Sequence, residues 1–143
     1  MTNDDGLPPI DRVTAPWWDA TRDRRLLLQK CAPCGHVQHY PRPVCTVCGA
    51  VGAYTWIEAS GLGTVDSYTV VHRAPTPGTE VPYTVARVRL AEGPVLLTRL
   101  DNVPDDASAF DAELRLTWQP LPDGRHLPTF TARAVDPAPR PGV

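Results

Sequence analysis

The sequence predicts a mostly β protein in which a short N-terminal helix and a small four-cysteine metal ribbon precede a sandwich or small closed barrel of five or six strands. Three observations lead to this prediction. Four cysteines form two closely spaced pairs, and residues 31–53 carry a single charge, Arg42. From residue 54, short segments rich in β-branched and aromatic residues alternate with loops containing Gly and Pro. A chain of 143 residues suits a small metal module joined to one compact unit.

The N-terminal segment, residues 1–30, is expected to be an extended leader followed by a helix. Its polar start, MTNDDGLPPI, is unlike a signal peptide, and no apolar run approaches the ~20 residues of a membrane helix. We therefore expect a cytoplasmic protein with no membrane partner. Pro16 is tolerated in a first helical turn, so the stretch from Trp17 to Arg24 is predicted to form two turns. Residues 26–30 are predicted to form a strand.

The four cysteines predict one structural zinc ion, bound by Cys31, Cys34, Cys45 and Cys48. Each pair has two intervening residues and is followed by glycine, as CAPCG and CTVCG. Such a turn directs two thiolates at one centre, and the glycine can adopt a positive φ. Two such turns give a tetrahedral four-sulfur site with bonds of about 2.3 Å, as in a rubredoxin-like ribbon. Four thiolates leave no open position, so the metal would be structural.

Other readings of this cluster stay open at the level of sequence. The pairs could be redox dithiols or disulfides, although a cytosolic setting favours metal binding. Iron is chemically possible at a four-thiolate site. His36 and His39 lie between the pairs and could serve as ligands if a cysteine were not one.

The region after residue 53 is predicted to form the strands of the sandwich or barrel. Gly61 and Gly63 flank the start of the longest strand, where glycine suits a bulge or a sharp bend. The predicted strands are 54–58, 62–73, 83–90, 95–100, 113–118 and 127–135. The predicted units are a leader and helix (1–30), a zinc ribbon (31–53), a barrel (54–136) and a disordered tail (137–143).

The charge distribution argues against a nucleic-acid partner. The net charge is −2, and residues 54–143 carry eleven acidic residues and eight arginines, with no basic stripe. Ribbons and barrels do bind single strands when a basic groove carries stacking aromatics, so this remains an alternative function. The aromatic side chains available for it are Tyr54, Trp56, Tyr68, Tyr83 and Trp118.

The chain shows no catalytic motif of its own. All four cysteines are assigned to metal, and we find no Gly-x-Ser-x-Gly elbow, phosphate loop or dinucleotide fingerprint. His72 falls within a strand pattern and is better interpreted as a barrel histidine than as a general base. We expect a protein that is not an enzyme by itself, with a stand-alone hydrolase as an alternative.

A partner interface is predicted near the N-terminal helix. Trp17 and Trp18 are adjacent on an element with too little chain around it to bury both, and exposed aromatic residues favour interfaces. Arg22 and Arg25 belong to the densest basic group, and Arg42 is the single charge of the ribbon. These five residues are the candidate partner contacts.

The sequence resembles the zinc-ribbon/OB-fold proteins that accompany thiolase-superfamily enzymes. The resemblance covers roughly residues 8–136. One departure is DASAFDAELRLTW before the fifth barrel strand, where the family often has a Gly-x-x-Val turn; the strand pattern itself survives. The motifs that carry the resemblance are Trp17 and Trp18, Leu26 to Leu28, the CxxCG turn at Cys31 to Gly35, the PRPVC approach at Pro41 to Cys45, and GLGTVDSYTVVH from Gly61 to His72.

The resemblance implies an OB-fold barrel and an accessory role in acyl-CoA chemistry. It implies a thiolase or a thiolase-fold aldolase as partner, in some bacteria one that cleaves steroid side-chain CoA esters, and an enoyl-CoA hydratase on the same complex. Related archaeal proteins bridge a thiolase and hydroxymethylglutaryl-CoA synthase. An OB barrel can bind extended ligands across one strand face, so Arg73, Arg87 and Arg89 are candidate CoA contacts.

Overall fold

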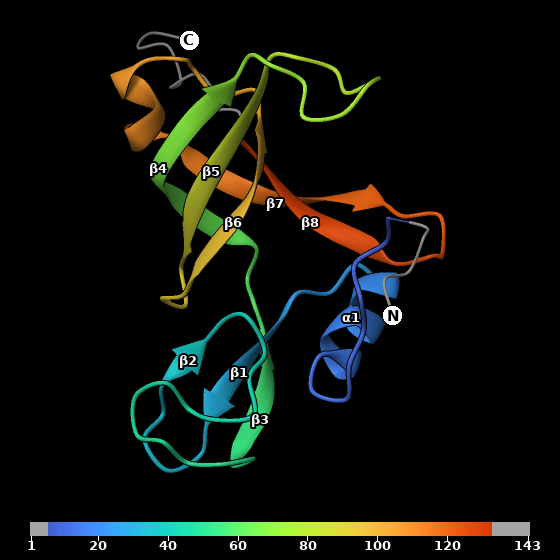
Figure 1. Cartoon of the computed structure of the whole chain (residues 1–143). Coiled ribbons are helices and arrows are strands. Elements are labelled where there is room, and N and C mark those ends of the chain that lie inside the picture. The colour runs from blue at the N-terminus through green and yellow to red at the C-terminus, as the bar shows by residue number, and fades with distance from the viewer. Residues whose placement is uncertain (1–5, 133–143) are drawn as a thin grey trace, which may run out of the picture.

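The computed structural model describes residues 6–132 and consists of a short helix, a three-stranded sheet and a five-stranded barrel (Figure 1). The predicted tail, residues 137–143, lies outside the described residues. The elements are α1 (Ala15–Arg22), β1 (Leu27–Cys31), β2 (Val37–Gln38), β3 (Tyr54–Glu58), β4 (Leu62–Val71), β5 (Tyr83–Leu90), β6 (Val95–Asp101), the 3₁₀ helix η1 (Ala107–Asp111), β7 (Glu113–Pro120) and β8 (His126–Ala132).

Helix α1 begins and ends close to the predicted residues, shifted by about one half-turn toward the N-terminus. The Asp11 carboxylate accepts from the N–H groups of Val13 (2.9 Å) and Thr14 (2.8 Å), which organises the turn before the helix. Pro16 lies in the first turn, where its missing N–H is not needed. The helix cannot continue to Arg24, because Arg24 adopts a positive φ of 55°.

The first sheet has the order β2-β1-β3, with both pairings antiparallel. The strand at residues 54–58, which the sequence pattern groups with the barrel, pairs here with β1 over its whole length, from Leu27↔Glu58 to Cys31↔Tyr54. A pattern of alternating residues gives the strand but not its partner, which explains the difference. The barrel therefore starts at Leu62, the first residue of β4.

The second unit is a closed barrel with the order β4-β5-β6-β8-β7, an OB fold. Gly63 lets β4 approach β5 closely, because a Cβ there would lie 2.8 Å from Val88 Cγ1 and 2.9 Å from the Arg89 carbonyl oxygen. The expected irregularity follows at once, as a register shift between Val65 and Ser67. The strand β7 survives the altered loop before it, which forms η1.

One hydrophobic cluster joins the barrel to the helix and to β1. Its barrel members are fully buried apolar side chains such as Val88, Leu114 and Phe130. Trp17 and Trp18 of α1 belong to the same cluster, as do Leu26 and Leu28. The helix thus lies between the two sheets and contacts both, while the cysteine end of the ribbon extends away from the barrel (Figure 1). No helix within residues 6–132 is long and apolar enough to cross a membrane.

Candidate metal centre

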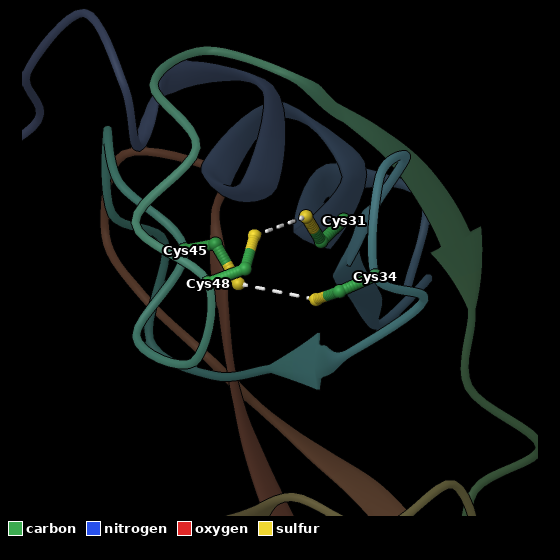
Figure 2. Close-up of side chains that lie close together, drawn as sticks. All are labelled: Cys31, Cys34, Cys45 and Cys48. Carbon is green, nitrogen blue, oxygen red and sulfur yellow. Dashed lines mark hydrogen bonds between the residues drawn. The ribbon is translucent and has the colours of Figure 1, made fainter.

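The four cysteine side chains meet at one point of the ribbon, and the backbone explains why (Figure 2). The two cysteine turns are built alike: Gly35 N–H donates to Cys31 O at 2.9 Å, and Gly49 N–H donates to Cys45 O at 3.0 Å. Both glycines have positive φ, 76° and 78°, as the CxxCG motif predicts. Each turn therefore returns the chain on itself and presents its two sulfurs on one side.

The sulfur positions fit a four-thiolate metal site. All four Sγ atoms lie within 4.8 Å of one another. The Sγ atoms of Cys31 and Cys48 are 3.5 Å apart and those of Cys34 and Cys45 are 3.6 Å apart, in both cases across the two turns (Figure 2). A tetrahedron with metal–sulfur bonds of about 2.3 Å has edges of roughly 3.8 Å, so little movement would be needed to bind zinc.

The electrostatics of the cluster also favour a bound cation. Backbone N–H groups of Cys48 and Val47 lower the pKa of the Cys45 thiol to about 6, which favours a thiolate there. For Cys31 the backbone N–H of Cys34 acts in the same direction, yet desolvation and the neighbouring thiols raise its pKa to about 12. Four adjacent sulfurs cannot ionise together unless a positive charge lies between them.

Two buried glutamines hold the chain that carries the second cysteine turn. Gln38 Nε2 donates to Gln29 Oε1 at 3.0 Å, and the Gln29 side chain bonds both the N–H (2.9 Å) and the C=O (3.0 Å) of Arg42. Gln38 Oε1 accepts from the N–H of Thr46 at 3.0 Å. Sequence reasoning missed this pair, because a glutamine in a strand is ordinarily exposed. The pairing depends on the β1–β2 register, which places Gln29 opposite Gln38 and which the sequence pattern does not give.

The histidines between the cysteine pairs lie outside the sulfur cluster. His36 Nε2 lies 3.3 Å from Thr46 Oγ1. The His39 ring packs 5.6 Å from the Trp17 ring, and its burial lowers the pKa to about 4, so it is neutral at pH 7. His72 is exposed just beyond the end of β4 at Val71, which corrects the expectation that it sits inside a strand.

Trp17 and Trp18 are both 3% exposed, so the expectation that the short element cannot bury both is wrong. They form an edge-to-face pair with centroids 4.7 Å apart, and Trp18 Nε1 donates to Tyr40 Oη at 3.0 Å. The Arg125 guanidinium, itself 3% exposed, covers the Trp18 ring at 4.5 Å. Residues of the ribbon loop and of the β7–β8 turn thus bury the two tryptophans. These residues are far from the helix in the sequence, so the sequence does not show that they pack there.

The structure does not gather the five candidate partner contacts into one patch. Arg22 donates to the Asp123 carbonyl oxygen at 2.7 Å, toward the barrel, and Arg25 pairs with Glu58 of the ribbon sheet at 3.3 Å. Arg42 is exposed and lies at the ribbon end of the molecule. The partner role of these residues stays a prediction.

Of the three candidate CoA contacts, the structure brings two together. Arg87 and Arg89 of β5 flank the carboxylate of Asp66 on β4, at 3.6 and 3.1 Å. Arg73 lies beyond the end of β4 at Val71, four strand residues past Ser67, the partner of Arg87. Both clustered arginines are half-exposed, so they remain accessible to a ligand phosphate.

Comparison with known proteins identifies both units. A family model described as the ChsH2 rubredoxin-like zinc ribbon domain matches residues 18–51, and one described as the ChsH2 C-terminal OB-fold domain matches residues 56–119. A solved chain of the "Ltp2-ChsH2(DUF35) aldolase" is 38% identical, with a TM-score of 0.77 over 88% of this chain and 98% of that one. A DUF35-family protein of unknown function from Sulfolobus solfataricus, 16% identical with a TM-score of 0.62, shares the fold over 85% of this chain and 86% of its own.

Curated relatives fall into two groups of different length. A probable enoyl-CoA hydratase alpha subunit of Thermomonospora curvata is 39% identical over 86% of this chain, and a 3-oxo-4,17-pregnadiene-20-carboxyl-CoA hydratase alpha subunit of Mycobacterium tuberculosis is 33% identical over 81%. The chain spans only 38% and 37% of the length of these two proteins. A DUF35 domain-containing scaffold protein of Methanocaldococcus jannaschii is 31% identical over 67% of this chain and 70% of its own.

Proposed function

Since the chain belongs to the ChsH2 (DUF35) family of zinc-ribbon and OB-fold proteins, we propose that it is a non-catalytic accessory subunit of an acyl-CoA complex whose catalytic partner is a thiolase-fold aldolase or thiolase. The observation that carries this proposal is the match to a chain of the Ltp2-ChsH2(DUF35) aldolase over 98% of that chain's length. The two hydratase alpha subunits support an enoyl-CoA hydratase as a second partner, and the pregnadiene name of one supports a steroid side-chain thioester as substrate.

The environments of the four histidines support the non-catalytic part of the proposal. His36 and His39 belong to the ribbon and its junction with α1, and His72 is exposed just beyond the end of β4. His126 is held by α1, with its Nδ1 2.8 Å from the Thr21 carbonyl oxygen. A general base needs a nucleophile within reach in a cleft that can hold a substrate. His36 and Thr46 line a common pocket, but the Thr46 hydroxyl is also 3.2 Å from Gln38 Oε1, within the hydrogen-bonded structure that holds the second cysteine turn, so we assign this contact a structural role.

The proposed cofactor is one structural zinc ion, bound by Cys31, Cys34, Cys45 and Cys48. When bound, the ion neutralises the thiolates and cross-links the two cysteine turns. The protein's own contribution is to hold the sulfurs in place through the two glycine turns and the Gln29–Gln38 pair. A role for the metal in turnover is not part of the proposal, because four thiolates fill a tetrahedral site.

The proposal also includes a contact between the barrel and the CoA moiety of the substrate. Arg87 and Arg89 would receive a phosphate of the CoA nucleotide in exchange for part of their pairing with Asp66. Arg73 is kept as a separate candidate at the far end of β4. Replacing Arg87 and Arg89 together by alanine is expected to weaken retention of an acyl-CoA by the assembled complex, with Arg115→Ala of β7 as the control.

The first experiment is a pull-down of the tagged full chain from its host, with mass spectrometry of the retained proteins and a zinc assay on the same sample. We expect a thiolase-superfamily protein near equal stoichiometry and one zinc per chain. Recovery of the zinc-loaded chain alone would overturn the accessory-subunit proposal. Turnover of acyl-CoA by the pure chain would point to the hydrolase alternative, and salt-dependent binding of an oligonucleotide to the single-strand alternative.

A further inference from the structure

In the barrel, β6 and β8 pair over only a short part of their length. These two strands are parallel neighbours, yet they pair only at Leu100↔Phe130 and Asp101↔Thr131. From there they separate toward the end of the barrel that faces the ribbon (Figure 1). Along the separated part, residues Val95–Arg99 of β6 have no strand partner on that side within the described part of the chain.

The alternation of hydrogen bonds along β6 shows which of its backbone N–H and C=O groups face β5 and which face the opening toward β8. At the β5–β6 turn Leu90 N–H donates to Pro94 O at 2.9 Å, so this is a hydrogen-bonded pair. Because such pairs alternate along an antiparallel ladder, Leu96 and Thr98 bond to β5. The N–H and C=O groups of Val95 and Leu97 therefore face the opening between β6 and β8. Unpaired groups of this kind are a template for one more strand.

The opposite side of the opening is closed to pairing. Pro128 of β8 has no N–H, and its carbonyl oxygen already accepts from Thr98 Oγ1 at 2.5 Å. At Pro128, a strand that enters the opening can therefore bond to β6 but finds no N–H on β8. This asymmetry favours a single added strand along the β6 edge and marks the Thr98–Pro128 bond as its far limit.

A pocket of about 520 Å³ lies beside this edge and can receive side chains of an added strand. Its walls are mainly aromatic and aliphatic and come from four segments that are distant in the sequence: Trp17 and Trp18 of α1, Tyr40 of the ribbon loop, Leu97 of β6 and Leu127 of β8. Leu97 is 70% exposed although it sits in the middle of a barrel strand. An exposed leucine beside an aromatic pocket is a common feature of a surface that becomes buried on binding.

The positive charge of Arg99 at the edge of the pocket indicates which kind of side chain an added strand would carry there. Arg99 lines the pocket, and its guanidinium lies 4.4 Å from the centre of the Tyr83 ring. No ion pair within residues 6–132 involves Arg99. An anionic group beside an apolar residue would therefore pair with the Arg99 guanidinium.

From these observations we propose that the β6 edge at Val95–Leu97 is a docking site for an extended segment of the partner polypeptide, which adds as a strand and places an apolar side chain in the pocket and an acidic one at Arg99. This mode, strand addition to a free edge, takes affinity from main-chain bonds and specificity from the adjoining pocket. The inference rests on the proposed accessory-subunit function and specifies which surface of this chain the partner uses.

The main-chain part of the proposal is tested by amide hydrogen exchange on the free chain and on the purified complex with its partner. We expect the Val95 and Leu97 amides to exchange at least tenfold more slowly in the complex. The amides of Leu96 and Thr98, already bonded to β5, serve as internal references and should change little. Unchanged exchange at Val95 and Leu97 in a stable complex would overturn the edge proposal and leave the accessory function standing.

The side-chain part is tested by Leu97→Asp and Arg99→Glu in the full chain. Both side chains are exposed, so the barrel should fold, which a thermal melt would verify. We expect each variant to weaken partner binding at least tenfold, whereas Phe110→Asp and Arg115→Glu, exposed residues elsewhere on the barrel, should bind like the unaltered chain.

Partner binding unchanged in both edge variants would refute the docking site, and failure of the unaltered chain to bind any thiolase-superfamily protein would refute the proposed function instead. Self-association that Leu97→Asp abolishes, measured by sedimentation without the partner, would assign the edge to a second copy of this chain and overturn the partner assignment.

Discussion

The ribbon and the barrel are held together by different physics. The barrel has a core of fully buried apolar side chains such as Val88, Leu114 and Phe130. The cysteine end of the ribbon instead leaves its apolar residues exposed: Val47 is 66% and Val51 76% exposed. Burial of apolar surface at ~25 cal/mol per Å² can stabilise the first unit but contributes little to the second. The ribbon therefore depends on its four thiolates and on the glutamine pair.

The largest expected effect comes from removing a thiolate. Cys31→Ser or Cys45→Ser should release the metal and unfold residues 31–53, because zinc binding to such modules is worth about 10–16 kcal/mol and supplies their folding free energy. The barrel should survive, since its core contains none of the cysteines. Zinc content and amide exchange, resolved by segment, measure the two responses in one sample.

The matched control for this test is His36→Ala, which changes a residue between the cysteine pairs that lies outside the sulfur cluster. It should retain a full equivalent of zinc. Loss of zinc from this variant, or a full equivalent retained by Cys31→Ser, would show that the ligand set is not the four cysteines. Iron in place of zinc in the same assay would decide the identity of the metal.

The second prediction concerns a substitution in the barrel core, which should destabilise the barrel and leave the metal site intact. Phe130 is completely buried, and Phe130→Ala should lower the free energy of unfolding by about 3–5 kcal/mol through the cavity it leaves. Zinc content below the melting temperature should not change, because no barrel residue contributes a sulfur. Urea denaturation followed by tryptophan fluorescence gives the loss of stability. Co-release of zinc at the barrel midpoint would mean that the two units unfold as one.

A smaller effect is expected from the buried polar pair. Gln29→Leu removes the side-chain partner of the Arg42 N–H and C=O and one of the two acceptors of Gln38 Nε2, which keeps its bond to Val44 O. An unsatisfied buried group costs about 1–3 kcal/mol. Since the cost falls on the folded ribbon, zinc affinity should drop about tenfold for each 1.4 kcal/mol. Competition with a chelator measures this. Thr55→Val on β3, an exposed position of the same sheet, is the control and should leave the affinity unchanged.

The contrast between the two units also separates what the sequence could predict from what it could not. The metal ligands follow from local spacing, because the CxxCG turn is completed within five residues, and the barrel strands follow from local composition. The partner of strand 54–58 and the cover over Trp17 and Trp18 could not be predicted, since both depend on residues far along the chain. Arg125 illustrates this: an arginine in a turn reads as exposed, yet it stacks on Trp18 with its charge paired to Asp123 at 2.6 Å.

The smallest expected effect tests the junction between the units, where His39 of the ribbon packs against Trp17 of the helix. Burial lowers the pKa of His39 to about 4, below the ~6.5 of an unfolded chain. Between these values the unfolded state binds the proton more tightly, so the stability from neutral His39 is complete above about pH 6.5 and is lost as the pH falls toward 4. The ring is partly solvated, so we expect a loss of about 1 kcal/mol.

His39→Phe should remove this pH dependence while keeping an aromatic ring against Trp17, so the variant and the unaltered chain differ only in the titrating group. Because acid also protonates cysteine thiolates, zinc content must be followed in both proteins, and only the interval in which both remain loaded is compared. Equal slopes of stability against pH in the two proteins would show that His39 is as solvated in the folded chain as in the unfolded one, and that the junction is looser than its packing against Trp17 indicates.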